Sequence, residues 1–302
     1  MEINELIRKR MCEYEPLSSL LTTFAKQPAI FSPTPPDDQA KGWKNKVHYP
    51  RIVFNYDLQA SPERNTDGTL SIILLCQNTS DVFPEMIEPE VKRSLKDILI
   101  NPDDGSLYTF AWERTDSFEI QDNSPQLVIG CEMRFDIIEY TGQETTDPDP
   151  IVGLNAYLKD VYPESIVVGY DRLEDIAVTT KERPVIYCRL ISLSNLETTY
   201  TVANMECRIA VHFLCPHSET RMRLTTAIAE RLSKDAEYKL MDGSPLRLTR
   251  LQVEYRSDYL KEGQVIITGR FGILRYREKV HKVTSVKNTY HFDKEVFING
   301  RR

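Results

Sequence analysis

Three charged side chains alternate along one apolar segment of the chain, at Glu132, Arg134 and Asp136. In an extended strand, residues two apart lie on the same face, so these side chains would form a row. Such a row has the residue types of a catalytic site. It is also the common composition of a strand face that meets solvent or another subunit. We therefore assign no catalytic residue and expect a protein that is not an enzyme.

A second group of residues has side chains that bind metal ions: Cys207, His212, Cys215 and His217. On a strand, however, Cys207 and Cys215 share a face with apolar residues, whereas His212 lies on the opposite face. The sequence also has no HExxH, CxxC or GxSxG motif and no phosphate-binding glycine loop. We therefore expect neither a metal nor a cofactor.

The composition is that of a globular protein large enough for two domains. The chain has 302 residues, of which 41% are hydrophobic and 27% are charged. A net charge of −7 argues against a dedicated binder of duplex DNA. Of the six cysteines, Cys76, Cys131, Cys188 and Cys207 sit in strand patterns with no paired spacing, which indicates reduced thiols and synthesis in the cytoplasm. We expect no secretory signal and no membrane span.

The charged row belongs to a segment that occurs twice. Residues 127–140 alternate apolar with small or charged positions, which predicts a long strand with one buried face. A similar segment follows about 135 residues later, at 265–276. Four positions are identical in the two copies: Arg134, Phe135, Ile137 and Tyr140 correspond to Arg270, Phe271, Ile273 and Tyr276.

The neighbouring elements repeat in the same order, which indicates a tandem duplication. The matched pairs are a strand behind a proline (50–54 and 184–188), an apolar strand (70–76 and 207–213, with Leu70 aligned to Cys207), a helical period (91–99 and 224–232) and an Asp-Gly-Ser turn (104–106 and 242–244). We predict an α+β fold of two related domains, each a mostly antiparallel four-stranded sheet packed by two helices. The strands are expected at 51–58, 69–77, 107–120 and 126–140, and at 184–191, 203–215, 245–255 and 262–277.

The domain boundary is predicted in a segment rich in proline and aspartate, at 141–150. This gives a first domain at 1–145, a second at 146–278 and a C-terminal extension at 279–302. We expect the main helix of the first domain to start near Pro89 and the helix after the boundary to start at Asp149 and Pro150.

The C-terminal extension has six Lys or Arg against two acids, with aromatic residues between them. Two interpretations remain open: a free polar tail, or an arm that becomes ordered on a neighbouring subunit. Under the second interpretation, the candidate interface residues are Lys279, Lys282, Lys287, Tyr290 and Phe292.

The order of elements resembles the tail terminator and tail completion proteins of tailed bacteriophages. The resemblance is carried by residues 49–54, by residues 70–75 with the helix after them, and by the strand at 134–140. Each repeat has about the size of one such domain, so the resemblance covers nearly all of residues 1–278. The duplication is the main departure, because many members of the family carry a single copy.

The resemblance implies a structural virion protein, assembled in the host cytoplasm. Such a protein would form a ring at the top of the tail, end the tail tube or sheath and provide the docking surface for the head connector. With two repeats, the ring would be a hexamer or a trimer with pseudo-six-fold symmetry. The expected partners are other copies of the chain, tail tube and sheath proteins, and connector proteins. DNA would pass through the channel without specific binding, which an acidic lining would favour.

Two alternatives remain open. The chain could be another component of a phage neck or baseplate, acting in head closure or tube initiation. It could instead be a cellular protein that binds a ligand between two related domains, which predicts a deep pocket with convergent polar groups.

Overall fold

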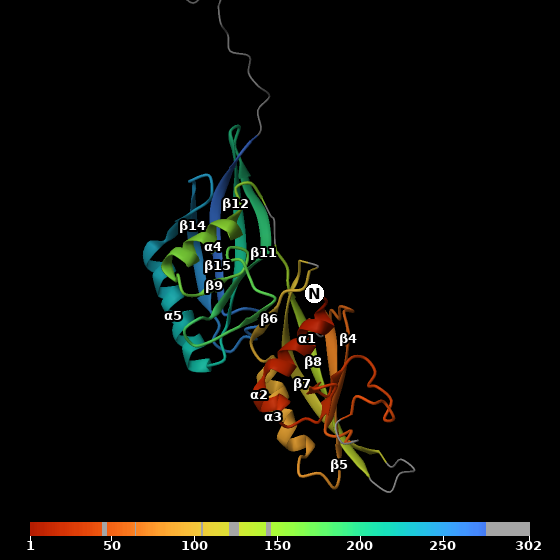
Figure 1. Cartoon of the computed structure of the whole chain (residues 1–302). Coiled ribbons are helices and arrows are strands. Elements are labelled where there is room, and N and C mark those ends of the chain that lie inside the picture. The colour runs from red at the N-terminus through yellow and green to blue at the C-terminus, as the bar shows by residue number, and fades with distance from the viewer. Residues whose placement is uncertain (44–46, 64, 104, 121–126, 143–145, 276–302) are drawn as a thin grey trace, which may run out of the picture.

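The protein consists of two β-sheets that meet at the middle of an elongated molecule, each with helices on one face (Figure 1). The computed structural model describes residues 1–302 except 44–46, 64, 104, 121–126, 143–145 and 276–302. Within these residues, the sheets have seven and six strands and are curled. No helix in the described ranges is long and apolar enough to span a membrane.

The first sheet has the strand order β10-β6-β7-β8-β5-β4-β3, and three helices cover one of its faces. Apolar residues from α1 and α3, such as Leu6, Met11 and Val91, pack against alternate residues of the strands. The elements are α1 (Ile3–Glu13), α2 (Glu15–Ser18), β3 (Ile30–Phe31), β4 (Arg51–Asp57), β5 (Gly68–Gln77), α3 (Pro84–Leu95), β6 (Ile98–Ile100), β7 (Leu107–Ile120) and β8 (Val128–Tyr140), with a separate two-stranded sheet of β1 (Thr23–Phe24) and β2 (Gln27–Pro28).

The second sheet has the order β13-β14-β15-β12-β11-β9, and α4 and α5 cover one of its faces. Leu154 from α4 and Ile228 from α5 are fully buried against it. The elements are α4 (Pro150–Val161), β9 (Ile166–Val167), β10 (Ile176–Val178), β11 (Val185–Thr198), β12 (Val202–Leu214), α5 (Ser218–Asp235), β13 (Glu237–Lys239), β14 (Pro245–Val253) and β15 (Val265–Leu274).

The two sheets share one topology. The order β6-β7-β8-β5-β4-β3 in the first sheet is matched strand for strand by β13-β14-β15-β12-β11-β9 in the second. Each ends in a single parallel pair, β3 with β4 and β9 with β11, and the other pairs are antiparallel. The first sheet gains one further strand, because β10 from the second half pairs with β6.

The predicted four-stranded antiparallel sheet with two helices in each domain is wrong. The sheets are larger and mixed, because short strands of two or three residues (β3, β6, β9, β10 and β13) extend both edges. A strand this short has too few residues to show an alternating pattern, so the sequence gives no sign of it. The alignment of Leu70 with Cys207 also changes, because Leu70 pairs with Phe135 whereas Met205 pairs with Phe271. This shift of two residues keeps the same side chains on the buried face.

Two prolines define helix starts in different ways. In α4 the start is as expected, because the Asp149 carboxylate accepts hydrogen bonds from the N–H groups of Ile151 and Val152 and Pro150 follows it. In α3 the expectation of a start near Pro89 is wrong. The helix begins at Pro84, and Pro89 lies inside it.

Candidate functional site

The interface residues predicted from the sequence all lie outside the described residues. Lys279, Lys282, Lys287, Tyr290 and Phe292 belong to 276–302, so the structure gives them no position. The chain up to that point ends at a defined place. β15 ends at Leu274, and Arg275 donates hydrogen bonds to carbonyls of Thr199 and Thr201 in the turn between β11 and β12.

The charged row on β8 divides between two environments. Glu132 accepts a hydrogen bond from Ser71 at 2.9 Å and pairs with Arg134 at 3.2 Å. Asp136 is buried and pairs with Lys261, which comes from the loop before β15 in the second half. The row is therefore neither one constellation nor one exposed face, because its last member joins the two halves.

The contact between the two halves, which we call the joint, has its own apolar core. It forms where the faces of the two sheets that carry no helix meet. Tyr140 from β8 stacks on Tyr187 from β11 with ring centroids 4.4 Å apart. The other buried members are Leu99, Leu107, Ile138, Ile166, Val168, Ala177, Val185, Leu214 and Leu260. Because residues two apart share a face, these side chains point away from the helix-covered cores.

His212 lies beside the two stacked tyrosines and is 1% exposed. Its Nδ1 is 3.0 Å from the carbonyl oxygen of Tyr259, and since a carbonyl only accepts, Nδ1 carries the proton. Burial lowers the pKa of His212 to about 4, and the guanidinium of Arg189 acts in the same direction. The imidazole is therefore neutral at neutral pH. Its Nε2 has no hydrogen-bond partner among the described residues.

Asp97 forms the second polar contact of the joint. Its carboxylate accepts a hydrogen bond of 2.6 Å from the Tyr259 hydroxyl, and its carbonyl accepts one of 2.7 Å from Thr179. The guanidinium of Arg221 lies over the Tyr259 ring at 3.6 Å. Burial raises the pKa of Asp97, although the Tyr259 hydrogen bond opposes this shift. Burial and the adjacent Asp97 charge also raise the pKa of Tyr259.

Lys261 and Asp136 form the third polar contact, at 2.9 Å, with side chains only 17% and 10% exposed. The same loop supplies the Leu260 carbonyl, which accepts a hydrogen bond from the Tyr140 hydroxyl at 3.1 Å. Residues 259–261 therefore contact the first half at three successive positions, through Asp97, Tyr140 and Asp136. With β10 added to the edge of that sheet, these contacts fix the two halves to each other.

The cysteines and histidines weighed as metal ligands lie in different parts of the molecule. Cys207 is in the core under α4 and α5, and His212 is in the joint on the opposite face of β12. Cys215 follows the strand, with its Sγ 3.9 Å from the carbonyl of Thr180. Within the described ranges, no three His, Cys, Asp or Glu side chains are placed to hold a metal ion.

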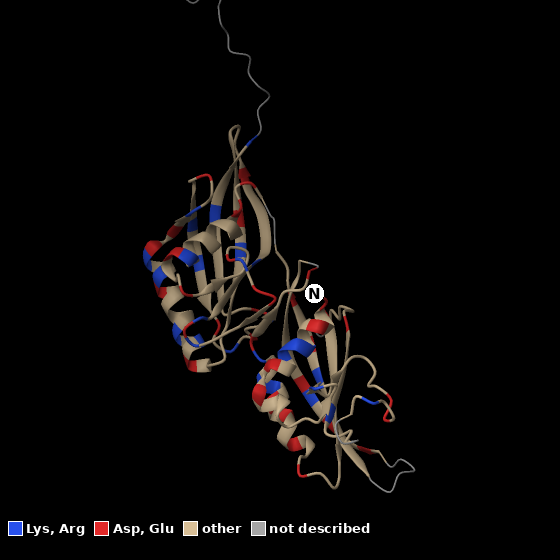
Figure 2. Ribbon diagram, viewed as in Figure 1, with Lys and Arg blue, Asp and Glu red and all other residues tan. Residues whose placement is uncertain are grey.

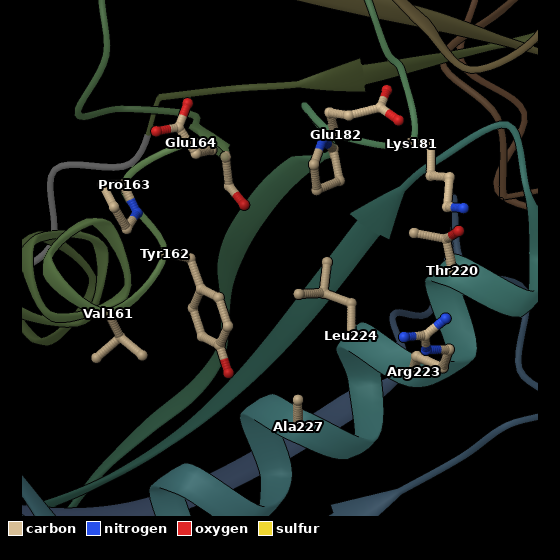
Figure 3. A pocket seen from close by; sticks show the side chains of 12 residues that line it. Val161, Tyr162, Pro163, Glu164, Lys181, Glu182, Thr220, Arg223, Leu224 and Ala227 are labelled. Atoms are coloured by element: carbon tan, nitrogen blue, oxygen red, sulfur yellow. The ribbon is translucent and has the colours of Figure 1, made fainter.

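A groove of about 520 Å³ runs between the end of α4 and the start of α5 (Figure 3). Tyr162 and Leu224 line its middle, while Glu164 and Arg223 lie on opposite sides and do not converge. The groove lies within the second half, and the joint between the halves leaves a smaller cavity of about 200 Å³ beside Tyr140, Tyr187 and His212. The deep interdomain pocket expected of a two-domain ligand-binding protein therefore has no counterpart in this groove.

Two long hairpins extend from the joint toward opposite ends of the molecule (Figure 1). One is formed by β7 and β8 and the other by β11 and β12. Both β7 and β11 begin with four buried residues and are then mostly exposed. Each of these strands pairs along its length with its hairpin partner. On its other side, no strand in the described part of the chain pairs with β7 beyond Arg114 or with β11 beyond Ile191.

The sequence matches no protein-family model and no curated protein. The class of protein is therefore inferred from its own geometry. That geometry is a body of two sheets fixed by a buried polar joint, with strand edges open at both ends.

Proposed function

We propose that this chain is a structural subunit that assembles with its own copies into a ring at the top of a phage tail. The observation that carries the proposal is the pair of projecting hairpins with open outer edges. Open strand edges are sites of association between chains. Because the two hairpins point to opposite ends, contacts through them join different surfaces of neighbouring copies, and such contacts generate rings when the rotation closes.

The joint supports this role, because a ring needs subunits of constant shape. The apolar core, the added strand β10 and the polar contacts of Asp97 with Tyr259, Asp136 with Lys261 and Tyr140 with the Leu260 carbonyl all hold one half against the other. The predicted resemblance of residues 49–54, 70–75 and 134–140 to tail terminator proteins adds the setting, which is the junction between tail and head. There the ring would end the tail tube or sheath and receive the connector.

Immunogold electron microscopy tests this position in a virion. Antibody against the purified protein is applied to tailed particles from cells that encode the chain. We expect gold label at the junction of head and tail, on particles whose capsids serve as the unlabelled control surface. Label at the far end of the tail would support the alternative role in a baseplate. The absence of label from all particles, with the protein found free in the lysate, would contradict a virion role.

A further inference from the structure

The outer end of the second sheet carries an apolar groove of about 1010 Å³, which we call the distal groove. It lies over the ends of β11, β12, β14 and β15, beyond the part of the sheet that α4 and α5 cover. Its apolar lining combines buried and exposed side chains: Leu196 is 46% exposed and Leu274 is 77% exposed. The apolar lining residues are Leu196, Val202, Leu248, Phe271 and Leu274.

The polar rim of the distal groove favours a basic occupant. Glu197 and Asp242 lie on the rim as acidic groups. The two arginines of the rim, Arg247 and Arg270, already pair with glutamates at 3.5 and 3.0 Å. Figure 2 shows few charged residues along β11, which carries only Arg189 and Glu197, and the turn at 199–201 has none.

The chain itself contains a segment of matching chemistry. Residues 276–302 have seven Lys or Arg and three Asp or Glu, a net charge of +4. Since the whole chain carries −7, residues 1–275 carry −11, and the two parts attract each other. The segment also contains nine large apolar residues: Tyr276, Val280, Val283, Val286, Tyr290, Phe292, Val296, Phe297 and Ile298.

The described part of the chain ends beside the groove, at the outer end of the hairpin of β11 and β12. Leu274 lines the groove, and Arg275 is held at the hairpin turn by the carbonyls of Thr199 and Thr201, so the chain leaves at the outer end. Residues 276–287 contain no Gly, Pro, Asn or Asp, and Ser285 is the one residue of a turn-favouring type among them, so this part of the sequence does not favour a tight turn directly after Arg275. Twenty-seven residues can span several tens of ångströms.

We infer that the C-terminal segment of one copy occupies the distal groove of a neighbouring copy, with Tyr290 and Phe292 against the apolar lining. Each copy then donates one arm and accepts another, so the contact is heterologous and can close a ring. The arm exchange rests on the proposed function for its setting, because a ring supplies the neighbour. The arm exchange adds a specific contact between neighbouring copies, which the open edges of the hairpins alone do not define.

Photocrosslinking in the full chain tests the exchange. Two preparations, one labelled with ¹⁵N and one unlabelled, carry p-benzoylphenylalanine in place of Tyr290 and are mixed before assembly. We expect crosslinks from position 290 to residues 196–204, 242–249 or 270–274, with about half of them joining a labelled to an unlabelled chain. Crosslinks only within one chain, or only to other regions, would overturn the inference.

Charge reversal of the surface gives a second readout. Leu196→Lys with Leu274→Lys places two positive charges at exposed positions of the groove, so folding is unaffected while the basic arm is repelled. We expect association to weaken at least tenfold in sedimentation, and Met222→Lys, at a 54% exposed site on α5, to leave it unchanged. If the crosslinks enter the distal groove but the copies form open chains and no closed ring, the arm exchange is upheld and the proposed ring is contradicted. Rings that persist with crosslinks elsewhere would uphold the ring and overturn the exchange.

Discussion

Replacement of Lys261 by methionine is expected to lower the free energy of unfolding by about 3 kcal/mol. The ammonium group of Lys261 lies 2.9 Å from Asp136, and both side chains are largely buried between the two halves. The methionine keeps the length of the side chain and removes its charge. The Asp136 carboxylate then loses this ion pair while it stays largely buried. Urea unfolding of the full chain measures the loss.

The matched control is Lys234→Met, which removes a lysine from an exposed pair with Glu230 on α5. Such a pair contributes little, so the change should stay within about 0.5 kcal/mol. Adding Asp136→Asn to Lys261→Met should restore part of the stability, because the second charge of the buried pair is removed as well. If Lys261→Met destabilises no more than the control, the buried pair does not hold the joint together.

Acidification from pH 6.5 to pH 4 is expected to remove about 3 kcal/mol of stability through His212 alone. The pKa of His212 is lowered to about 4 by burial, whereas an unfolded histidine titrates near 6.5. Between these values the unfolded chain binds a proton that the folded chain excludes. The contribution of His212 is therefore complete above pH 6.5 and is lost as the pH falls toward 4.

The difference between the wild type and His212→Asn isolates this contribution. Asparagine can still donate a hydrogen bond to the Tyr259 carbonyl, but it does not titrate. Asp97 acts in the opposite direction, because its raised pKa makes stability fall as the pH rises, yet it is present in both proteins and cancels. Urea unfolding between pH 7.5 and 4.5 should show a steeper loss for the wild type, and His217→Asn, an exposed site, should match the wild type. Parallel curves for wild type and His212→Asn would show that His212 titrates normally.

The sequence predicts the long elements well because each carries its own periodic pattern. β7 has the predicted bounds, and β5, β8 and β12 lie within about two residues of them where described, whereas β11 runs to Thr198, well beyond the predicted end at 191. The short strands are different, since β3, β9 and β10 are extended only where their backbone pairs with a neighbouring strand. For the same reason the sheets have more strands than predicted, and one pairing crosses between the halves.

The joint could not be predicted from local patterns. Asp97 and Tyr259 are 162 residues apart in the chain, and Asp136 and Lys261 are 125 apart. Asp136 looks in the sequence like one more polar residue on an exposed strand face, and only the docking of the second half buries it. His212 gave a partial signal, because its place on the face of β12 opposite the apolar core was predicted from the alternation. Its neighbours Tyr140 and Tyr187 come from strands that the alternation alone cannot bring together.

The charge pattern and the hairpins together describe a subunit that associates through its ends. Both signs of charge are interspersed over the helices in Figure 2, whereas β11 offers an open and nearly uncharged edge. Natural proteins normally block such an edge with charge, proline or a covering segment. In our account, neighbouring copies cover it within the ring, and the joint keeps the two ends in a constant relation.

Native mass spectrometry of the purified full chain at about 10 µM tests this account most directly, since that concentration exceeds the dissociation constant of a typical stable assembly. The chain has a mass of 35.0 kDa, so we expect a closed assembly at three or six times that mass. A single species at 35.0 kDa, unchanged on further concentration, would contradict a ring built by this chain.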